Sequence, residues 1–149
     1  MLLAVESSAE DSKRYVCTGT KGERRFTETS ISGCQEIPLE QGWRNFLVAP
    51  SAIVDIKPGV LSEGDGVTLW MRFYLAEEAD DAKGRWAYDY LESLHKFYCG
   101  KRETVLIKGT YKLKGETVFV RSAGDSIIEK VDAGTVNEAI YLAVCEDDK

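Results

Sequence analysis

The stretch that decides the fold is VTLWMRFY, residues 67–74. Apolar residues occupy every second position of it, which is the period of a β-strand that buries one face. The alternate positions include Trp70 and Tyr74. Because these side chains are also large and partly apolar, we expect both faces of this strand to be covered.

Shorter stretches on both sides show the same strand pattern. The upstream one continues after Pro50 and is expected to end at Pro58-Gly59, because proline and glycine favour turns. Residues 61–66 are expected to form a loop, and Lys114-Gly115 the turn of a downstream hairpin. Besides residues 67–74, the expected strands of this region are 43–48, 52–57, 103–108, 110–113 and 116–121.

Two segments between these strands permit more than one interpretation. Residues 86–98 carry aromatic and apolar side chains that fit alternating strand positions or a short helix, and we favour the strand. Residues 77–81, EEADD, predict a solvated acidic loop. Calcium binding is the alternative, but the oxygen ligands lack the alternating spacing and the turn glycine of an EF-hand loop.

The C-terminal segment has a helical pattern. Thr135-Val136-Asn137-Glu138 has the sequence of a capping box, and apolar residues then recur at helical spacing. We therefore expect an amphipathic helix over residues 135–145 that packs on the sheet. The predicted fold class is α+β, a mainly antiparallel β-sheet with this helix at its C-terminal end.

The chain before residue 42 differs from the rest. Residues 1–13 are polar apart from a short apolar start and predict a flexible leader, the remnant of a signal peptide or a cloning start. Residues 14–41 predict a small β-hairpin bracketed by cysteines, followed by a connector over residues 35–41. Residues 42–149 are expected to form the main domain.

Four cysteines, far apart and without a Cys-x-x-Cys pair, predict structural disulfides rather than a zinc site or a redox motif. Of the three possible connectivities, we favour Cys17–Cys34, which brackets the hairpin, and Cys99–Cys145, which could tie a strand to the final helix. Disulfides are typical of exported proteins, so we expect export. Four reduced thiols in a cytosolic protein are the alternative.

The charge of the chain limits its partners. A net charge of −6 argues against nucleic acid, because binding to phosphates needs a positive surface. No stretch is apolar enough to span a membrane. Basic residues nevertheless gather at two places, Lys21, Arg24 and Arg25, and then Lys101, Arg102, Lys108, Lys112 and Lys114. Both groups fit solvated strand faces or a contact patch for an acidic protein, and the second is our candidate binding surface.

Candidates for catalysis are few. His95 is the only histidine, and the chain has no Gly-x-Ser-x-Gly turn, no phosphate-binding Gly-Lys loop and no Gly-x-Gly-x-x-Gly turn. We expect a structural or surface role for His95. Asp55 and Asp89 would favour an enzyme only if they shared a buried cleft. The prediction is a protein without catalytic activity, cofactor or metal.

The order of several features resembles a known family. They are Trp43, a strand carrying Trp70, the run Tyr98-Cys99-Gly100-Lys101-Arg102, and Gly134-Thr135-Val136-Asn137-Glu138-Ala139 leading to Val144-Cys145. On these, residues 43–145 resemble the surface-adhesin protein E family of bacterial envelope proteins. Many members have an acidic residue where this chain has Tyr98.

The resemblance implies an antiparallel sheet with a C-terminal helix, export in a Gram-negative bacterium and a Cys99–Cys145 disulfide. The adhesin that gives the family its name binds host matrix proteins such as vitronectin and laminin, but none of its binding residues can be placed on this sequence. A shared fold does not imply a shared ligand.

The expected function is therefore that of a non-catalytic binding module exported to the periplasm or to the outer-membrane surface. An adhesin that contacts host matrix proteins is the sharpest form of this expectation, and a homodimer through an exposed sheet edge is one arrangement. The alternative is a periplasmic structural or inhibitory protein that binds another bacterial envelope protein.

Overall fold

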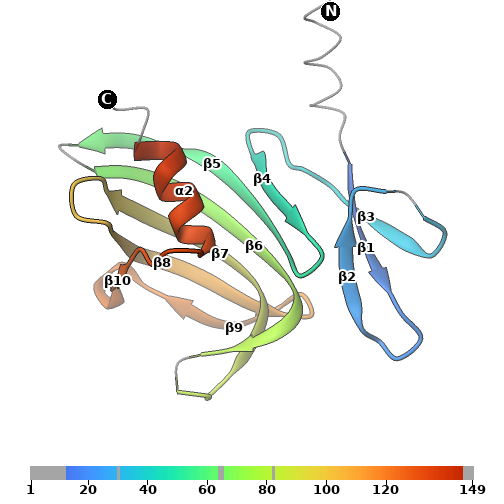
Figure 1. Ribbon diagram of the computed structural model, residues 1–149. Helices are drawn as coiled ribbons and strands as arrows, with labels where there is room; N and C mark the ends of the chain where they lie inside the picture. Colours follow the sequence, from blue (N-terminus) through green and yellow to red (C-terminus); the bar gives the residue numbers. More distant parts are fainter. Residues whose placement is uncertain (1–12, 30, 64–65, 82, 146–149) are drawn as a thin grey trace, which may run out of the picture.

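The computed structural model describes residues 13–29, 31–63, 66–81 and 83–145. Two antiparallel sheets and one α-helix account for most of them (Figure 1). The predicted α+β fold, a mainly antiparallel sheet with a C-terminal helix, is confirmed. The expected leader, residues 1–13, lies outside the described residues except for Lys13.

The main sheet has seven strands in the order β10-β8-β7-β6-β5-β4, with β9 also pairing with β8. β9 and β10 follow one another along the same edge of β8, because β9 pairs with residues 109–113 and β10 with residues 103–106. The strands are β4 (Arg44–Ala49), β5 (Ala52–Glu63), β6 (Gly66–Asp80), β7 (Ala87–Tyr98), β8 (Glu103–Leu113), β9 (Glu116–Arg121) and β10 (Ile127–Lys130).

The hairpin of β5 and β6 is longer than the sequence predicted. β5 continues through Pro58, and its pairing register with β6 shifts between Pro58 and Ser62. The expected end at Pro58-Gly59 and the expected loop at 61–66 are therefore wrong for the residues described. Proline has no N–H to donate to a ladder, and an irregular register is a common way to keep it within a strand.

The acidic segment and the ambiguous segment both belong to strands. β6 extends to Asp80, so residues 77–80 are strand rather than the expected loop. Ala79 and Asp80 pair with the start of β7, and this pairing outweighs the low β-propensity of acidic residues. The strand interpretation of residues 86–98 is confirmed, since β7 covers Ala87–Tyr98.

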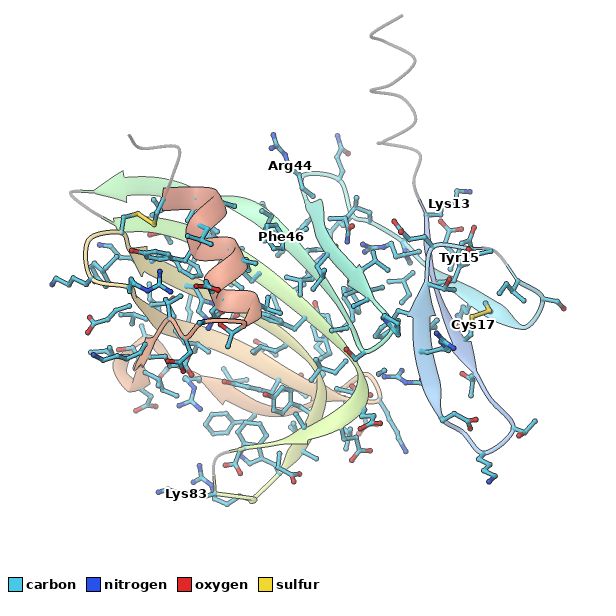
Figure 2. The ribbon with its side chains drawn as sticks, in the orientation of Figure 1. Lys13, Tyr15, Cys17, Arg44, Phe46 and Lys83 are labelled. Atoms are coloured by element: carbon cyan, nitrogen blue, oxygen red, sulfur yellow. A yellow bond between two sulfur atoms is a disulfide. The ribbon has the colours of Figure 1, made fainter. Side chains whose placement is uncertain are left out.

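Helix α2 (Val136–Cys145) lies across one face of the main sheet, which we call the inner face (Figure 1). Its Ile140 belongs to one core cluster with Val54, Met71 and Phe97, and all four side chains are fully buried. Burial of a side chain of this size contributes roughly 1.5–3 kcal/mol. Figure 2 shows the side chains that fill the space between the helix and the sheet.

The predicted capping box starts the helix. The Oγ1 atom of Thr135 accepts a hydrogen bond from the backbone N–H of Glu138 at 3.2 Å. The carboxylate of Glu138 accepts one in return from the backbone N–H of Gly134 at 3.0 Å. Gly134 has a φ of 82°, which glycine adopts without strain. Local sequence therefore fixes where α2 begins.

The N-terminal segment forms a second, three-stranded sheet in the order β2-β1-β3. The expected hairpin is present as β1 (Arg14–Thr18) and β2 (Arg24–Thr27), but the expected connector contains a third strand, β3 (Cys34–Ile37). Cys17 and Cys34 are direct register partners on β1 and β3. The sequence did not indicate β3, because its short polar stretch is a strand only through its pairing with β1.

A buried ion pair joins the small sheet to the main sheet. Arg14 on β1 donates two hydrogen bonds to the carboxylate of Asp55 on β5, at 2.7 and 2.6 Å, and the two side chains are 3% and 1% exposed. Asn45 adds a third hydrogen bond to Asp55 at 3.1 Å. The Arg14 guanidinium also donates to the carbonyls of Ile37 and Pro38. The charges of both partners are thus matched by hydrogen bonds.

Removal of one partner should destabilise the protein strongly. Asp55→Ala leaves a buried guanidinium without its carboxylate, and we expect the free energy of unfolding in urea to fall by roughly 3–5 kcal/mol. Glu36→Ala removes an exposed contact to Lys13 at 4.0 Å, and serves as the control with little effect. A loss for Asp55→Ala as small as that of the control would contradict a structural role for the pair.

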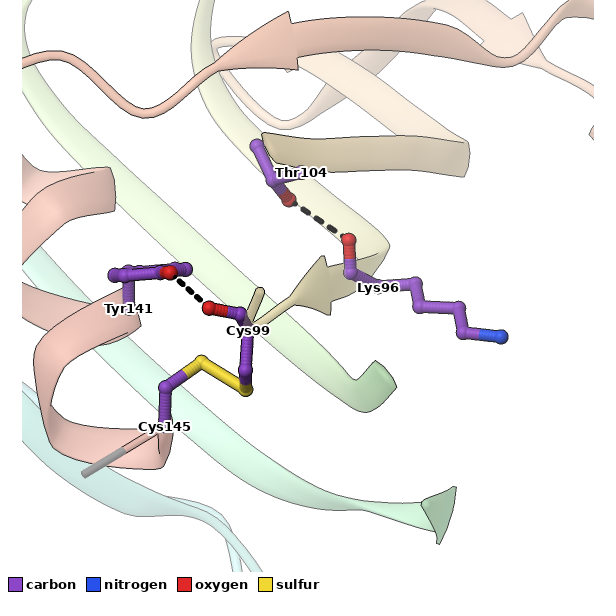
Figure 3. The surroundings of a disulfide bond; sticks show 5 residues. All are labelled: Lys96, Cys99, Thr104, Tyr141 and Cys145. Carbon is purple, nitrogen blue, oxygen red and sulfur yellow. Dashed lines mark hydrogen bonds between the residues drawn. A yellow bond between two sulfur atoms is a disulfide. The ribbon is translucent and has the colours of Figure 1, made fainter. Parts of the chain in front are cut away.

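Both predicted disulfides are confirmed. Cys17 is bonded to Cys34 and Cys99 to Cys145, and no free cysteine remains. Figure 2 shows the first bond beside Cys17 on the small sheet. Figure 3 shows the second, which joins the end of β7 to the last residue of α2, with the hydroxyl of Tyr141 donating to the carbonyl of Cys99. The helix is thus held to the sheet covalently at its C-terminal end.

The two bonds should stabilise different parts. Cys99→Ser with Cys145→Ser opens a loop of 46 residues, which in the chain-entropy model costs about 4 kcal/mol. We expect the α2 amides to lose hydrogen-exchange protection first. Cys17→Ser with Cys34→Ser is the matched control, because it should loosen the small sheet and leave α2 protected. Equal loss of protection in α2 for both variants would contradict separate roles.

Candidate functional site

The candidate binding surface is the face of the main sheet opposite α2, which we call the outer face. Register pairing shows which side chains lie on it. One row across four strands consists of Lys57, Trp70, Leu94 and Lys108. The next row consists of Thr68, Lys96, Val105 and Ile128.

The small sheet covers only part of the outer face. Asp55, which is bonded to Arg14 of the small sheet, is 1% exposed, and Ile53 on the same face of β5 is 0% exposed. The guanidinium of Arg14 also lies 5.8 Å from the ring centroid of Tyr74. Farther along the face, Val120 and Ile128 are 60% and 69% exposed. The outer face therefore has a covered part around Ile53 and Asp55 of β5. Its open part begins at the exposed Lys57 and continues over β6, β7, β8 and the edge strands β9 and β10.

The lysines of the open part lie beside aromatic rings. The ammonium of Lys108 is 5.6 Å from the ring centroid of Trp70, and that of Lys96 is 5.2 Å from the ring centroid of Tyr98. Contacts of this kind contribute about 0.5–1 kcal/mol at exposed sites. The lysine stems add apolar area, so the open part combines apolar surface with positive charge.

The five candidate binding residues do not form one patch. Lys108 and Lys112 lie on the open part of the outer face, and Lys112 is 5.6 Å from the ring centroid of Tyr90. Lys101, in the turn before β8, lies 5.4 Å from the ring centroid of Tyr98. Lys114 lies in the turn after β8, so the length of this strand separates it from Lys101.

Arg102 serves the helix instead of the outer face. Its guanidinium donates to the Glu138 carboxylate at 2.9 Å and to the Val131 carbonyl at 3.3 Å, and it lies 5.2 Å from the ring centroid of Tyr141. The pKa of Glu138 is lowered by the hydrogen bonds from Gly134 and Arg102. Arg102 is thus a positioning residue for the start of α2.

Sequence reasoning missed Lys57 and Lys96. Lys96 lies two positions after Leu94 on β7, so the period of a strand places these two side chains on one face. Lys57 lies on a different strand from Trp70, and only the register pairs them. Their grouping with Lys108 depends on strand register, which the chain alone does not give. A register irregularity between Leu94 and His95 on β7 decides which residues of β8 face outward.

The first basic group has a different role. Arg24 donates to the carbonyl of Leu75 and lies 3.7 Å from the carboxylate of Asp89, so it ties β2 to the main sheet. Lys21 and Arg25 are exposed on the small sheet and its turn. The structure does not bring this group to the open part of the outer face.

Asp55 and Asp89 do not line a common cavity among the described residues. Asp55 is held by Arg14 and Asn45, whereas Asp89 accepts from the backbone N–H of Lys114 at 3.3 Å. The cavity that Asp89 lines lies between the small sheet and the β8–β9 turn and does not include Asp55. The arrangement that would have favoured an acid-catalysed reaction is not found there.

His95 is 3% exposed on the inner face, and its Nδ1 atom forms a hydrogen bond with the hydroxyl of Ser93 at 3.0 Å. Burial lowers the pKa of His95 to about 4. The imidazole is therefore neutral at pH 7.

No family model, curated protein or solved structure matches this chain. The resemblance of residues 43–145 to the surface-adhesin protein E family therefore stays a prediction. In the part of the chain that the structure describes, no helix has both the length and the apolar character needed to cross a bilayer.

The buried imidazole should make stability depend on pH. The pKa of His95 is about 4 in the folded state and about 6.5 in an unfolded chain. Between these values the unfolded state binds a proton that the folded state does not. We expect stability to fall by up to roughly 3 kcal/mol as the pH drops from about 6.5 to about 4.

The matched variant is His95→Gln, which cannot titrate in this window. Subtracting its urea unfolding curves from those of the wild type removes the contribution of the carboxylates. The difference should decline between pH 6.5 and pH 4 and then level off. A difference that does not change with pH would contradict the burial of a neutral ring.

Proposed function

We propose that this chain is an exported binding module without catalytic activity, which receives an acidic protein surface on the open part of its outer face. The observation that carries the proposal is the row of Trp70 and Leu94 between Lys57 and Lys108. Interfaces commonly place aromatic anchors at their centre and charges at the rim.

The charge distribution supports an acidic partner. The whole chain carries a net charge of −6, yet Lys57, Lys96, Lys108 and Lys112 share this face. Glu92 on the same face is paired with Arg72 at 2.9 Å, so its negative charge is offset locally. A local positive field on an acidic protein orients an approaching acidic surface.

The disulfides support an exported location. Both disulfides link elements of the fold and neither belongs to a redox-active Cys-x-x-Cys motif. Structural disulfides of this kind persist in the periplasm and on the cell surface but are rare in the cytosol. The resemblance to the surface-adhesin protein E family points to the envelope of a Gram-negative bacterium. An adhesin for host matrix proteins is the sharpest form of the proposal.

The second form is a periplasmic structural or inhibitory protein that binds an envelope protein of the same cell. The same face serves both forms, so location distinguishes them. A homodimer would use the edge made by β9 and β10, where Val118, Val120 and Ile128 are exposed. That edge adjoins the open part of the outer face.

Protease accessibility separates the two forms. Cleavage of the protein on intact cells would support the adhesin form, whereas protection until the outer membrane is opened would contradict it and support the periplasmic form.

A photoreactive residue at position 94 tests the face itself. We expect it to crosslink to a protein partner in the compartment so identified. The pair Lys108→Glu and Lys112→Glu should abolish that crosslink, because both changes oppose an acidic partner. Lys83→Glu, on the β6–β7 turn, is the matched control and should leave it unchanged. An unchanged crosslink in the double variant would contradict the proposed face.

A further inference from the structure

The inner face contains a cavity of about 360 Å³ that the proposed protein-binding surface does not use. It lies where α2 begins, between Val136 and the strands β6, β7, β8 and β10. Phe73, Leu91, Leu106 and Ile127 form apolar walls. A cavity of this size and character falls within the range of small-molecule sites.

His95 contributes a buried polar group to the lining of this cavity. Its side chain lines the cavity and is 3% exposed. The hydroxyl of Ser93 is fully buried, and His95 Nδ1 is its hydrogen-bond partner among the described residues. A buried hydroxyl needs an acceptor, so Ser93 donates to Nδ1 and the proton of the neutral ring lies on Nε2.

The Nε2–H group of His95, a residue that lines the cavity, is the group left to bind a ligand. It has no protein partner among the described residues, and yet no side-chain nitrogen or oxygen buried within that part of the chain lacks one. Nε2 is therefore not sealed in the core. It can donate a hydrogen bond to a molecule inside the cavity.

The surroundings select against charged ligands. Glu129 lines the same cavity and repels an anion. A cation would pair with Glu129, but it cannot accept the hydrogen bond that His95 Nε2–H offers, so it would leave this donor without a partner. An uncharged ligand that accepts one hydrogen bond and is otherwise apolar satisfies all of these groups.

We propose that this cavity is a binding site for a small uncharged molecule with an apolar or aromatic body and one carbonyl oxygen, which accepts the hydrogen bond from His95 Nε2–H. The site is on the other face of the sheet from the proposed protein-binding surface. An experiment that overturns one of these two proposals therefore does not overturn the other.

The test uses acetophenone and ethylbenzene, which have similar shapes and differ in the carbonyl oxygen. Because the chain has one histidine, its imidazole ¹⁵N signals can be assigned by NMR without ambiguity. We expect acetophenone to shift the Nε2 signal saturably. The binding of ethylbenzene is measured from the shifts of side-chain methyl signals. We expect its affinity to be roughly threefold to tenfold lower, because it lacks the hydrogen bond that the carbonyl oxygen accepts.

Neighbouring residues of β10 give matched variants. Ile127→Trp fills the cavity and should abolish the acetophenone shifts, whereas Ile128→Trp adds the same side chain on the exposed outer face and should preserve them. Absence of saturable shifts in the wild type would overturn the proposal. So would equal binding of both ligands, or shifts that persist in a folded Ile127→Trp variant.

Discussion

The outer face depends on one interaction, the buried pair of Arg14 and Asp55. Asp55 sits within β5, and its burial is tolerated because Arg14 and Asn45 satisfy its carboxylate. The small sheet is thereby fixed over the β5 end of the outer face, which leaves the strands beyond it open. The pair does not need to add net stability to matter, because either charge would be costly if it were buried alone, and the two side chains must therefore meet where the small sheet contacts β5.

The inner face is organised by the two ends of α2. Cys99–Cys145 fixes the C-terminal end, and the Arg102–Glu138 contact with the capping box fixes the N-terminal end. A helix of ten residues held in this way covers part of a much wider sheet. Because the helix is too short to cover this face completely, a cavity remains where the helix begins. It lies over His95, where a longer helix or a bulkier residue on β10 would have sealed the imidazole in the core.

The sequence predicted the elements better than the surfaces. Alternation at 67–74 and the capping box at 135–138 are local patterns, and each predicted its element correctly. The disulfides join distant residues, but four cysteines can pair in only three ways. The Arg14–Asp55 pair was not predicted, because the chain has 25 acidic residues and nothing in the sequence selects one of them as the partner of Arg14. Of the five candidate residues, Lys108 and Lys112 lie on the open part of the outer face, whereas Arg102 contacts the start of α2. Register and turn geometry, rather than spacing, decide which way a basic side chain points.

The aromatic neighbours of the lysines affect how the open part of the outer face could bind. A free lysine side chain loses considerable rotamer freedom when it is fixed at an interface. Lys96 and Lys108 already rest against Tyr98 and Trp70. Part of that ordering has therefore occurred before a partner arrives, and each lysine stem adds apolar area beside its ring. An acidic partner would gain both the charge interaction and the burial of Trp70, whereas a neutral apolar partner would leave the ammonium groups desolvated without a partner.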